Sequence, residues 1–388
     1  MLALLLASGA WAGSLLVDVG PETHIDVDRS GNWGRLFPAE TGWDFFFASG
    51  GEYQHVPLDD AFVPDLTRLT RLTGRSDLVD HAIARCPDGS WLHIASASAL
   101  SLDDSAWAFR YDADLGMTAS SQLFDSEPTQ VHRDMPVVCA EGFAATGFFD
   151  PDSRVSFRLV ELGPDATAVR VVEPDHAPIV TGSSLFSDGV TVGIASFKGD
   201  DGDYLHVTEY TTADLAVEDR HLQDVSIRGQ KAYWSQGYTR VGNRHVLAHM
   251  VRDEAAGFDA QDGDVWLSVF NLDWRLSEQV QVSHNTPPNG GMQPWLTFRD
   301  DTLVVSYTRE LENYAFVVTI DRVEAGLDPG PDEPDDTAEP SDTGDTSDSG
   351  TIDTAVDEDP EPVESACGCN GAAAWLLLPL ALTRRRRA

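Results

Sequence analysis

Residues 293–320 read Gln-Pro-Trp-Leu-Thr-Phe-Arg, Asp-Asp, Thr-Leu-Val-Val-Ser-Tyr-Thr-Arg, Glu-Leu-Glu-Asn and Tyr-Ala-Phe-Val-Val-Thr-Ile. Apolar and polar residues alternate with a period of two in much of this stretch, which is the pattern of half-buried β-strands. The acidic pair Asp300-Asp301 lies between the first two runs and marks a turn. The stretch therefore predicts three consecutive strands joined by short turns.

The same arrangement recurs along most of the chain. The expected end of the third strand falls at Val56, Tyr111, Val160, Tyr210, Phe270 and Val318, with spacings of 55, 49, 50, 60 and 48 residues. Four-stranded units that repeat about every fifty residues are typical of a β-propeller, which closes into a ring and so protects its sheet edges. We predict an all-β chain with a six-bladed β-propeller over residues 13–327. Five or seven blades, or a pair of β-sandwiches, are the alternatives.

The approximate copies are residues 31–75, 76–130, 131–175, 176–230, 231–287 and 288–324. The last copy ends soon after its third strand. The segment Thr23–Asp28, which precedes the first full copy, is expected to supply the missing outer strand. This pairing would close the ring with the protein's own N-terminal segment.

The segment after the repeats has a different composition. Residues 328–364 contain fifteen acidic residues and no Lys or Arg, and they are rich in Pro, Thr, Ser and Gly. Such a segment has little apolar surface to bury and repels itself, so we expect a disordered, extended linker.

Residues 365–388 combine three features. Cys367-Gly-Cys369 precedes an apolar run of about a dozen residues, shorter than the roughly 17 to 25 of a membrane-spanning helix, and four arginines, Arg384–Arg387, follow it. This order resembles the MYXO-CTERM sorting signal of myxobacterial surface proteins. The resemblance covers only the tail. It implies a short hydrophobic sorting helix with transient membrane contact, cleavage by a sorting protease, and cell-surface or outer-membrane anchoring through Cys367 or Cys369, of which Cys369 is favoured.

The N-terminus agrees with export. Residues 2–11 are mostly apolar, and Ala10-Trp11-Ala12 is an A-x-A cleavage site, so we predict a signal peptide over residues 1–12 and a mature start near Gly13. No Lys or Arg precedes the apolar region, which is atypical for a signal peptide.

Charge and cysteine content restrict the function. The formal net charge is −38, and the chain has only two lysines, Lys198 and Lys231. A protein without a basic face is a poor partner for nucleic acid. Cys86 and Cys139 are the cysteines of the repeat region and lie at nearly the same place in consecutive first strands, so we predict a disulfide between blades two and three.

In a propeller the first strand of every blade lines the axis, so residues near the start of these strands are expected to meet at one rim. The residues at this place are Trp33, Asp80, His81, His132, Asp134, Asp175, His176, Gln236, Gln293 and Trp295. Ordinary turn chemistry is the competing interpretation for Asp and His at such positions.

Two functions follow from this rim. The first is a surface-displayed, non-catalytic module that binds an extracellular carbohydrate, peptide or protein. Its candidate ligand-binding residues are His81, His132, His176, Gln236, Gln293 and Trp295. The alternative is an extracellular glycoside hydrolase, for which Asp80, Asp134 and Asp175 are the candidate carboxylates.

No cofactor is required by any motif. The turn Gly199-Asp-Asp-Gly-Asp203 offers oxygen ligands for a structural calcium ion at Asp200, Asp201 and Asp203, although it lacks the full EF-hand spacing. Asp and Gly also occur in hairpin turns for their backbone conformation alone.

Overall fold

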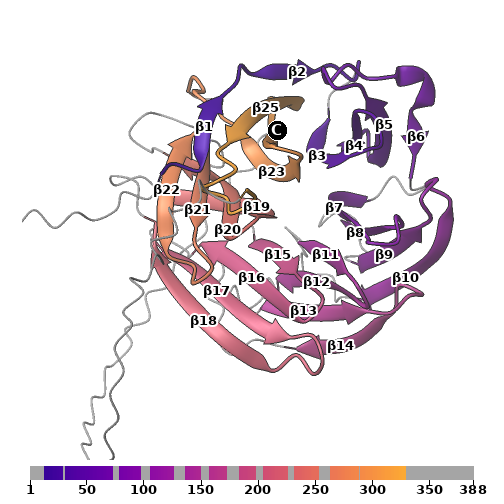
Figure 1. Cartoon of the computed structure of the whole chain (residues 1–388). Coiled ribbons are helices and arrows are strands. Elements are labelled where there is room, and N and C mark those ends of the chain that lie inside the picture. The colour runs from indigo at the N-terminus through magenta and orange to yellow at the C-terminus, as the bar shows by residue number, and fades with distance from the viewer. Residues whose placement is uncertain are drawn as a thin grey trace, which may run out of the picture. The chain divides into compact units, whose positions relative to one another are not determined.

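The computed structural model describes residues 13–28, 31–72, 78–97, 105–125, 136–149, 157–172, 183–197, 204–225, 231–252, 263–287 and 289–328. These residues form six antiparallel sheets arranged as a β-propeller (Figure 1). The prediction of six four-stranded blades is therefore confirmed. The predicted linker beyond Asp328 and the predicted sorting signal lie outside the described residues.

In the first three blades the strands follow one another from the axis outward. The strands are β3 (Asn32–Pro38), β4 (Trp43–Ser49), β5 (Glu52–Leu58) and β6 (Thr70–Arg71) in blade 1; β7 (Leu78–Arg85), β8 (Trp91–Ala97), β9 (Ser105–Tyr111) and β10 (Met117–Asp125) in blade 2; and β11 (Val137–Ala140), β12 (Phe143–Phe149), β13 (Phe157–Leu162) and β14 (Ala168–Val172) in blade 3.

The fourth and fifth blades repeat this order, and the sixth supplies three strands from its own part of the chain. The strands are β15 (Ser183–Ser187), β16 (Thr191–Phe197), β17 (Tyr204–Thr211) and β18 (Val217–Asp224) in blade 4; β19 (Lys231–Val241), β20 (Arg244–Arg252), β21 (Asp264–Phe270) and β22 (Leu276–Gln281) in blade 5; and β23 (Met292–Arg299), β24 (Thr302–Arg309) and β25 (Glu312–Ile320) in blade 6.

The N-terminal segment completes blade 6. Strand β2 (Thr23–Ile25) pairs with β25, as expected from the sequence, and strand β1 (Leu16–Val19) pairs with the other half of β25. The outer edge of the last blade is thus covered by two short strands from the start of the chain. This pairing joins the two ends of the propeller and removes an exposed edge.

The hydrophobic core is divided among the spaces between blades. Six clusters of buried side chains are present in the described residues, and each draws its members from two neighbouring blades. Between blades 4 and 5, for example, Phe186 and Phe197 pack against Phe270 and Trp274. Each blade is stabilised by burial against its neighbours, so the ring gains most of its stability when it is closed.

The hairpins between third and fourth strands share one conformation. In blade 5, Trp274 has φ 58°, its N–H donates to the Asn271 carbonyl, and Asn271 Oδ1 accepts from the Asp273 and Arg275 N–H groups. Phe62, Leu115, Ala166 and Leu215 have the same positive φ in the corresponding turns of blades 1 to 4. Such turns normally place Gly in the left-handed position. Here an apolar residue occupies it because its side chain packs into the space between blades.

Within the described ranges the one helical element is a 3₁₀ turn, η1 (Leu66–Arg68), between β5 and β6. No helix in that part of the chain has the length and apolar character that a membrane crossing requires.

Candidate functional site

An axial cavity opens where the first strands of the blades end. It has a volume of about 630 Å³ and is lined by all six blades. Each blade contributes at least one lining residue from its first strand or from directly after it. In order from blade 1 to blade 6, these include Phe37, Arg85, Cys139, Asp188, Arg240 and Trp295. We had placed the candidate site at the starts of these strands, so the cavity lies at the opposite mouth of the ring. We call it the axial cavity.

Trp295 is held in a fixed orientation at the wall of the axial cavity. Its indole Nε1 donates to the Leu36 carbonyl at 3.1 Å, and the guanidinium carbon of Arg35 lies 4.4 Å from the ring centroid. Burial lowers the pKa of Arg35 to about 10. The guanidinium still remains charged at neutral pH and makes a cation–π contact with the indole. Trp295, a candidate ligand-binding residue from the sequence, lines this cavity from within β23.

The carboxylate of Asp188 is already engaged by its own turn. Its Oδ1 accepts hydrogen bonds from the Val190 and Thr191 N–H groups at 3.0 and 2.8 Å. The hydrogen bond from Thr191 is the largest cause of a lowered Asp188 pKa, and the charge of Arg240 acts in the same direction. Asp188 therefore stays ionised and presents a fixed negative charge to the cavity.

Tyr238 and His245 line a second wall of the cavity, and the buried ring of Trp274 packs against His245. The Tyr238 hydroxyl lies 2.9 Å from His245 Nδ1, and the imidazole stacks on Trp274 with a centroid distance of 4.0 Å and an interplanar angle of 11°. Trp274 Nε1 in turn donates to Glu209 Oε1 at 2.9 Å. Burial lowers the pKa of His245 to about 4, so the imidazole is neutral near pH 7. The wall is a connected hydrogen-bonded unit rather than a set of free side chains.

These groups equip the axial cavity for binding. Arg85 and Arg240 offer cationic donors, and Asp188 and Glu209 offer acceptors beside aromatic surface. A general acid for glycoside hydrolysis needs a carboxyl group with a raised pKa. Among the described carboxyl groups with a shifted pKa, only that of Asp264 is raised, chiefly by burial, and Asp264 does not line this cavity.

A disulfide joins Cys86 and Cys139, with a Cα–Cα distance of 4.9 Å, as predicted for blades 2 and 3. It lies between the axial cavity and a larger pocket of about 950 Å³, and Cys139 lines both. In this side pocket the Nη1 of Arg110 lies 3.3 Å from Cys86 Sγ, and Nη2 donates to the Gly163 carbonyl at 3.4 Å. The bridge thus forms part of the wall of both spaces.

The prediction that His81 binds ligand at the rim is corrected. His81 is buried between blades 1 and 2, where its ring stacks on Tyr53 at 4.6 Å and its Nδ1 lies 3.0 Å from His93 Nε2. Burial lowers the pKa of His81 to about 3. The strand β7 begins at Leu78 rather than after His81, which turns this side chain into the inter-blade space.

Gln293 is also an internal residue. Gln293 and Trp33 both have positive φ, 54° and 57°, at register shifts near the starts of β23 and β3. The side-chain Oε1 of Gln293 accepts from the Trp33 N–H at 3.0 Å. The sequence correctly placed the two residues at equivalent positions, but they connect blades 6 and 1 instead of facing a ligand.

The remaining rim residues are described only in part. Asp80 lies within β7, and its Oδ2 accepts from Ser96 Oγ at 3.4 Å. Gln236 lies in β19 between two paired residues, Tyr233 and Gly237, where the register shifts. His132, Asp134, Asp175, His176, Asp200, Asp201, Asp203, Cys367 and Cys369 lie outside the described residues.

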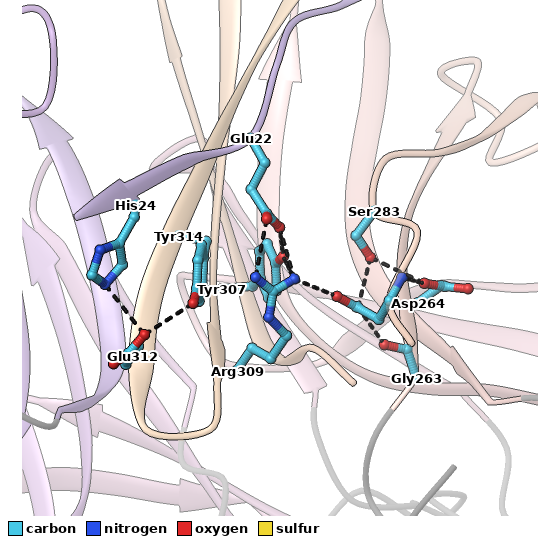
Figure 2. A network of polar contacts seen from close by, with 10 residues as sticks. Glu22, His24, Gly263, Asp264, Ser283, Tyr307, Arg309, Glu312 and Tyr314 are labelled. Carbon is cyan, nitrogen blue, oxygen red and sulfur yellow. Dashed lines mark hydrogen bonds and ion pairs between the residues drawn. The ribbon is translucent and has the colours of Figure 1, made fainter. Parts of the chain in front are cut away.

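The calcium prediction therefore remains a prediction. In the described ranges, no group of three or more His, Cys, Asp or Glu side chains is arranged to hold a metal ion. Asp264, from a turn of the kind that we considered for calcium, is instead an acceptor for Ser283 Oγ and for the Asn285 N–H (Figure 2). Asp264 thus has a structural role in blade 5.

The same network continues to the N-terminal segment. Asn285 Oδ1 accepts from Arg309 Nη1 at 2.8 Å, and Arg309 forms two hydrogen bonds of 3.0 Å with the carboxylate of Glu22 (Figure 2). The Tyr307 hydroxyl also contacts Glu22, and the Arg309 guanidinium carbon lies 4.0 Å from the Tyr314 ring centroid. This network fastens the closing segment to blades 5 and 6.

The cavity residues Arg85, Asp188 and Arg240 were missed because we searched the starts of the first strands. Each of them lies at the end of the first strand or directly after it, a position that the fifty-residue repeat also marks.

No family model matches the chain, and no curated protein matches its sequence. Similar solved structures exist. A protein of unknown function from Dyadobacter fermentans is 11% identical with a TM-score of 0.55, covering 77% of this chain and 98% of that one. A neuraminidase-like protein of A/little yellow-shouldered bat/Guatemala/060/2010 is 13% identical with a TM-score of 0.51, covering 79% of this chain and 99% of that one. At these identities the likeness establishes the propeller fold alone.

Proposed function

We propose that this protein is a surface-displayed, non-catalytic β-propeller that binds an extracellular carbohydrate in its axial cavity. The observation that carries the proposal is the cavity itself, which all six blades line with aromatic rings, cationic donors and fixed acceptors. Pockets of several hundred Å³ with a few convergent polar groups are the usual form of small-ligand sites.

Carbohydrate is the ligand class that best fits this mixture. Sugar rings present an apolar face and several hydroxyl groups, so they need flat aromatic surface next to donors and acceptors. Trp295 and Tyr238 offer the aromatic surface, and Arg240 and Asp188 offer charge-assisted hydrogen bonds. Peptide and protein ligands are the other outcomes of a binding test.

Binding without hydrolysis is supported by the state of the cavity carboxylates. Asp188 is held ionised by its turn, and Glu209 accepts a hydrogen bond from Trp274. The ionised Asp188 carboxylate has no proton to donate to a glycosidic oxygen. The glycoside hydrolase alternative depends on Asp80, Asp134 and Asp175 and is tested by assaying the purified chain for glycan cleavage.

A panel of short glycans tests the proposal directly. Trp295→Ala and Arg240→Gln should each weaken binding of any glycan that the protein recognises by at least about tenfold, which corresponds to 1.4 kcal/mol. Arg275→Gln is the matched control, because Arg275 is an exposed arginine of the same blade that does not line the cavity. Binding that is equally strong in all three variants would contradict the axial site.

Export and anchoring complete the proposal. The predicted signal peptide, acidic linker and C-terminal motif together support display at the cell surface, with Cys369 as the favoured anchoring residue. Surface labelling of whole cells should detect the propeller in the wild type and should lose it in the Cys367→Ser, Cys369→Ser double variant. A double variant that is displayed as well as the wild type would refute anchoring through this motif.

A further inference from the structure

The first described residues of the chain are built into the closing blade. Leu15 and Leu16 are only 2% and 7% exposed and belong to the hydrophobic cluster between blades 5 and 6. The Leu15 carbonyl accepts a hydrogen bond from the Asp321 N–H at 2.8 Å. The position of Gly13, two residues earlier, is therefore fixed by a buried anchor.

Two carboxylates flank this start. Glu278 on β22 accepts from the Leu15 and Leu16 N–H groups at 2.9 and 3.3 Å and also contacts Ser14 Oγ. Glu324, which follows β25, lies across Gly13, since a Cβ atom built on Gly13 would be 2.5 Å from Glu324 Oε1. A side chain at position 13 would have to displace the Glu324 side chain.

The charge around Gly13 is unbalanced. Besides Glu278 and Glu324, Asp321 lies close by and accepts from the Val323 and Glu324 N–H groups. Among the described residues, Arg244 approaches Glu324, with its Nη2 3.8 Å from Glu324 Oε2, whereas Arg322, next to Asp321, is paired with Asp301 and Asp328. Three carboxylates and one guanidinium leave an excess of negative charge, which a further cation would offset.

We propose that the missing cation is the protein's own α-ammonium group, created by cleavage between Ala12 and Gly13 and bound by Glu324. A signal peptidase of the export machinery adds water across this peptide bond. Ala12 leaves with the new carboxylate, and the Gly13 nitrogen takes up protons and becomes the ammonium. The inference rests on the export part of the proposed function, but not on carbohydrate binding.

The bound ammonium adds an interaction that the uncut precursor lacks. An amide nitrogen at Gly13 carries no charge, whereas an ammonium beside Glu324 forms an ion pair. Gly13 is exposed, and the Glu324 side chain is 28% exposed. The closure of the propeller is then strongest only in the processed protein. Cleavage of the precursor thereby adds to the stability of blade 6.

Two forms of the chain test this pair. One form begins at Gly13 with a free amine, and the other retains Ala10-Trp11-Ala12 before it. At pH 7 the Gly13 form should have a Tm about 2 °C or more higher. An α-amino group has a pKa of about 7.7 to 8.0 in an unfolded chain, and pairing raises it. The difference should therefore be fully present below that pH and disappear as pH rises through the raised value.

A carboxamide at position 324 provides the decisive comparison. In the Glu324→Gln variant the two forms should have the same Tm at pH 7, while the Glu40→Gln control, at an exposed site in blade 1, should keep the difference. Equal Tm values for the two wild-type forms, or a difference that survives Glu324→Gln, would overturn the proposal. The Arg244→Gln variant removes only the weak contact between Arg244 and Glu324. It should therefore keep the difference in Tm between the two forms of the chain.

N-terminal sequencing of protein recovered from a secreting host completes the test. The expected first residue is Gly13. A chain that starts at or beyond Leu15, or one that remains uncut, would overturn the proposal. A failure of glycan binding would leave these results unchanged, so the two proposals fail separately.

Discussion

The side-chain Oε1 of Gln293 accepts a hydrogen bond from the backbone N–H of Trp33 at 3.0 Å, although the two residues are 260 positions apart. Each occupies the left-handed bulge near the start of an innermost strand, one in blade 6 and the other in blade 1. The contact spans the point at which the ring closes. The ring is therefore closed in two places. This contact joins the innermost strands of blades 6 and 1, and β1 and β2 pair with the outer edge of blade 6.

The ion pair between Glu22 and Arg309 should contribute measurably to this closure. Glu22→Gln removes a carboxylate that accepts two hydrogen bonds from the guanidinium and a contact from Tyr307. We expect a loss of about 1 to 2 kcal/mol in the free energy of unfolding, because a partly buried guanidinium loses its charged partner. Urea unfolding monitored by tryptophan fluorescence measures this loss.

Asp18→Asn is the control for the Glu22 variant. Asp18 lies on β1 of the same closing segment, and its side chain is exposed. Its substitution should change stability by less than about 0.5 kcal/mol. If Asp18→Asn and Glu22→Gln had equal effects, the network of Figure 2 would not be the source of the stabilisation.

Loss of the Cys86–Cys139 disulfide should destabilise the ring. The bridge closes a loop with a sequence separation of 53 residues and joins two neighbouring blades. Cross-links over loops of this size typically add about 2 to 4 kcal/mol of stability. Thermal unfolding should therefore occur at lower temperature in reductant for the wild type, whereas the Cys86→Ser, Cys139→Ser variant should be unaffected by reductant. Free thiols in a non-reduced peptide map would contradict the bridge.

Acid should weaken the fold through its buried histidines. Burial lowers the pKa of His249 to about 4, against 6.5 in an unfolded chain, so between these pH values the unfolded state binds a proton that the native state does not. The His249 contribution is fully present above pH 6.5 and is lost as pH falls toward 4, at up to about 1.4 kcal/mol per pH unit.

The His249→Gln variant checks this acid effect. Denaturant midpoints measured from pH 7.5 to 4.5 should fall less steeply with pH for the variant than for the wild type. The difference in slope should correspond to about one fewer proton taken up on unfolding. Glutamine keeps a polar partner for Ser268 Oγ, which lies 2.7 Å from His249 Nε2. An unchanged slope would show that His249 is protonated in the folded protein.

Trp274 should be required for packing despite its unfavourable backbone. Its φ of 58° costs on the order of 1 kcal/mol, which glycine would relieve. The side chain is only 1% exposed, between Phe186 and Phe270, and removal of a buried Trp costs about 3 to 5 kcal/mol. Trp274→Gly should therefore be strongly destabilising in thermal unfolding.

Leu115→Gly is the matched variant in blade 2. Leu115 has a φ of 67° in the corresponding turn, but its side chain is only partly buried. Relief of the backbone and loss of packing should nearly cancel, giving little change in Tm. A large loss for Leu115→Gly and a small loss for Trp274→Gly would show that the turn, and not the packing, governs stability.

Much of the fold could be predicted from local patterns. The six marker residues from Val56 to Val318 all lie in third strands and are at most 1% exposed, because period-two alternation reports which face of a strand is buried. The outer-strand role of Thr23–Ile25 followed from counting the strands of the last copy. The pairing of Leu16–Val19 with β25 was not expected, because the short run Leu-Val-Asp-Val carries no repeat signal.

The predicted site was less successful for a geometric reason. A bulge near the start of an innermost strand redirects the residues beside it, so Trp33 and Gln293 face the next blade rather than the channel. The sequence does not report such bulges, because they depend on the partner strand. His81 shows the same effect, since it lies directly after the register shift between Leu78 and Asp80 in β7 and is buried against Tyr53.

The sequence by itself determined the all-β class and favoured six blades and the pairing of Cys86 with Cys139, because strand alternation and repeat spacing can be read directly along the chain. Only the tertiary structure decided which mouth of the ring holds the described cavity. Arg85, Asp188 and Arg240 converge there from three blades. Their approach is set by the closure of the ring, and closure depends on contacts between residues hundreds of positions apart.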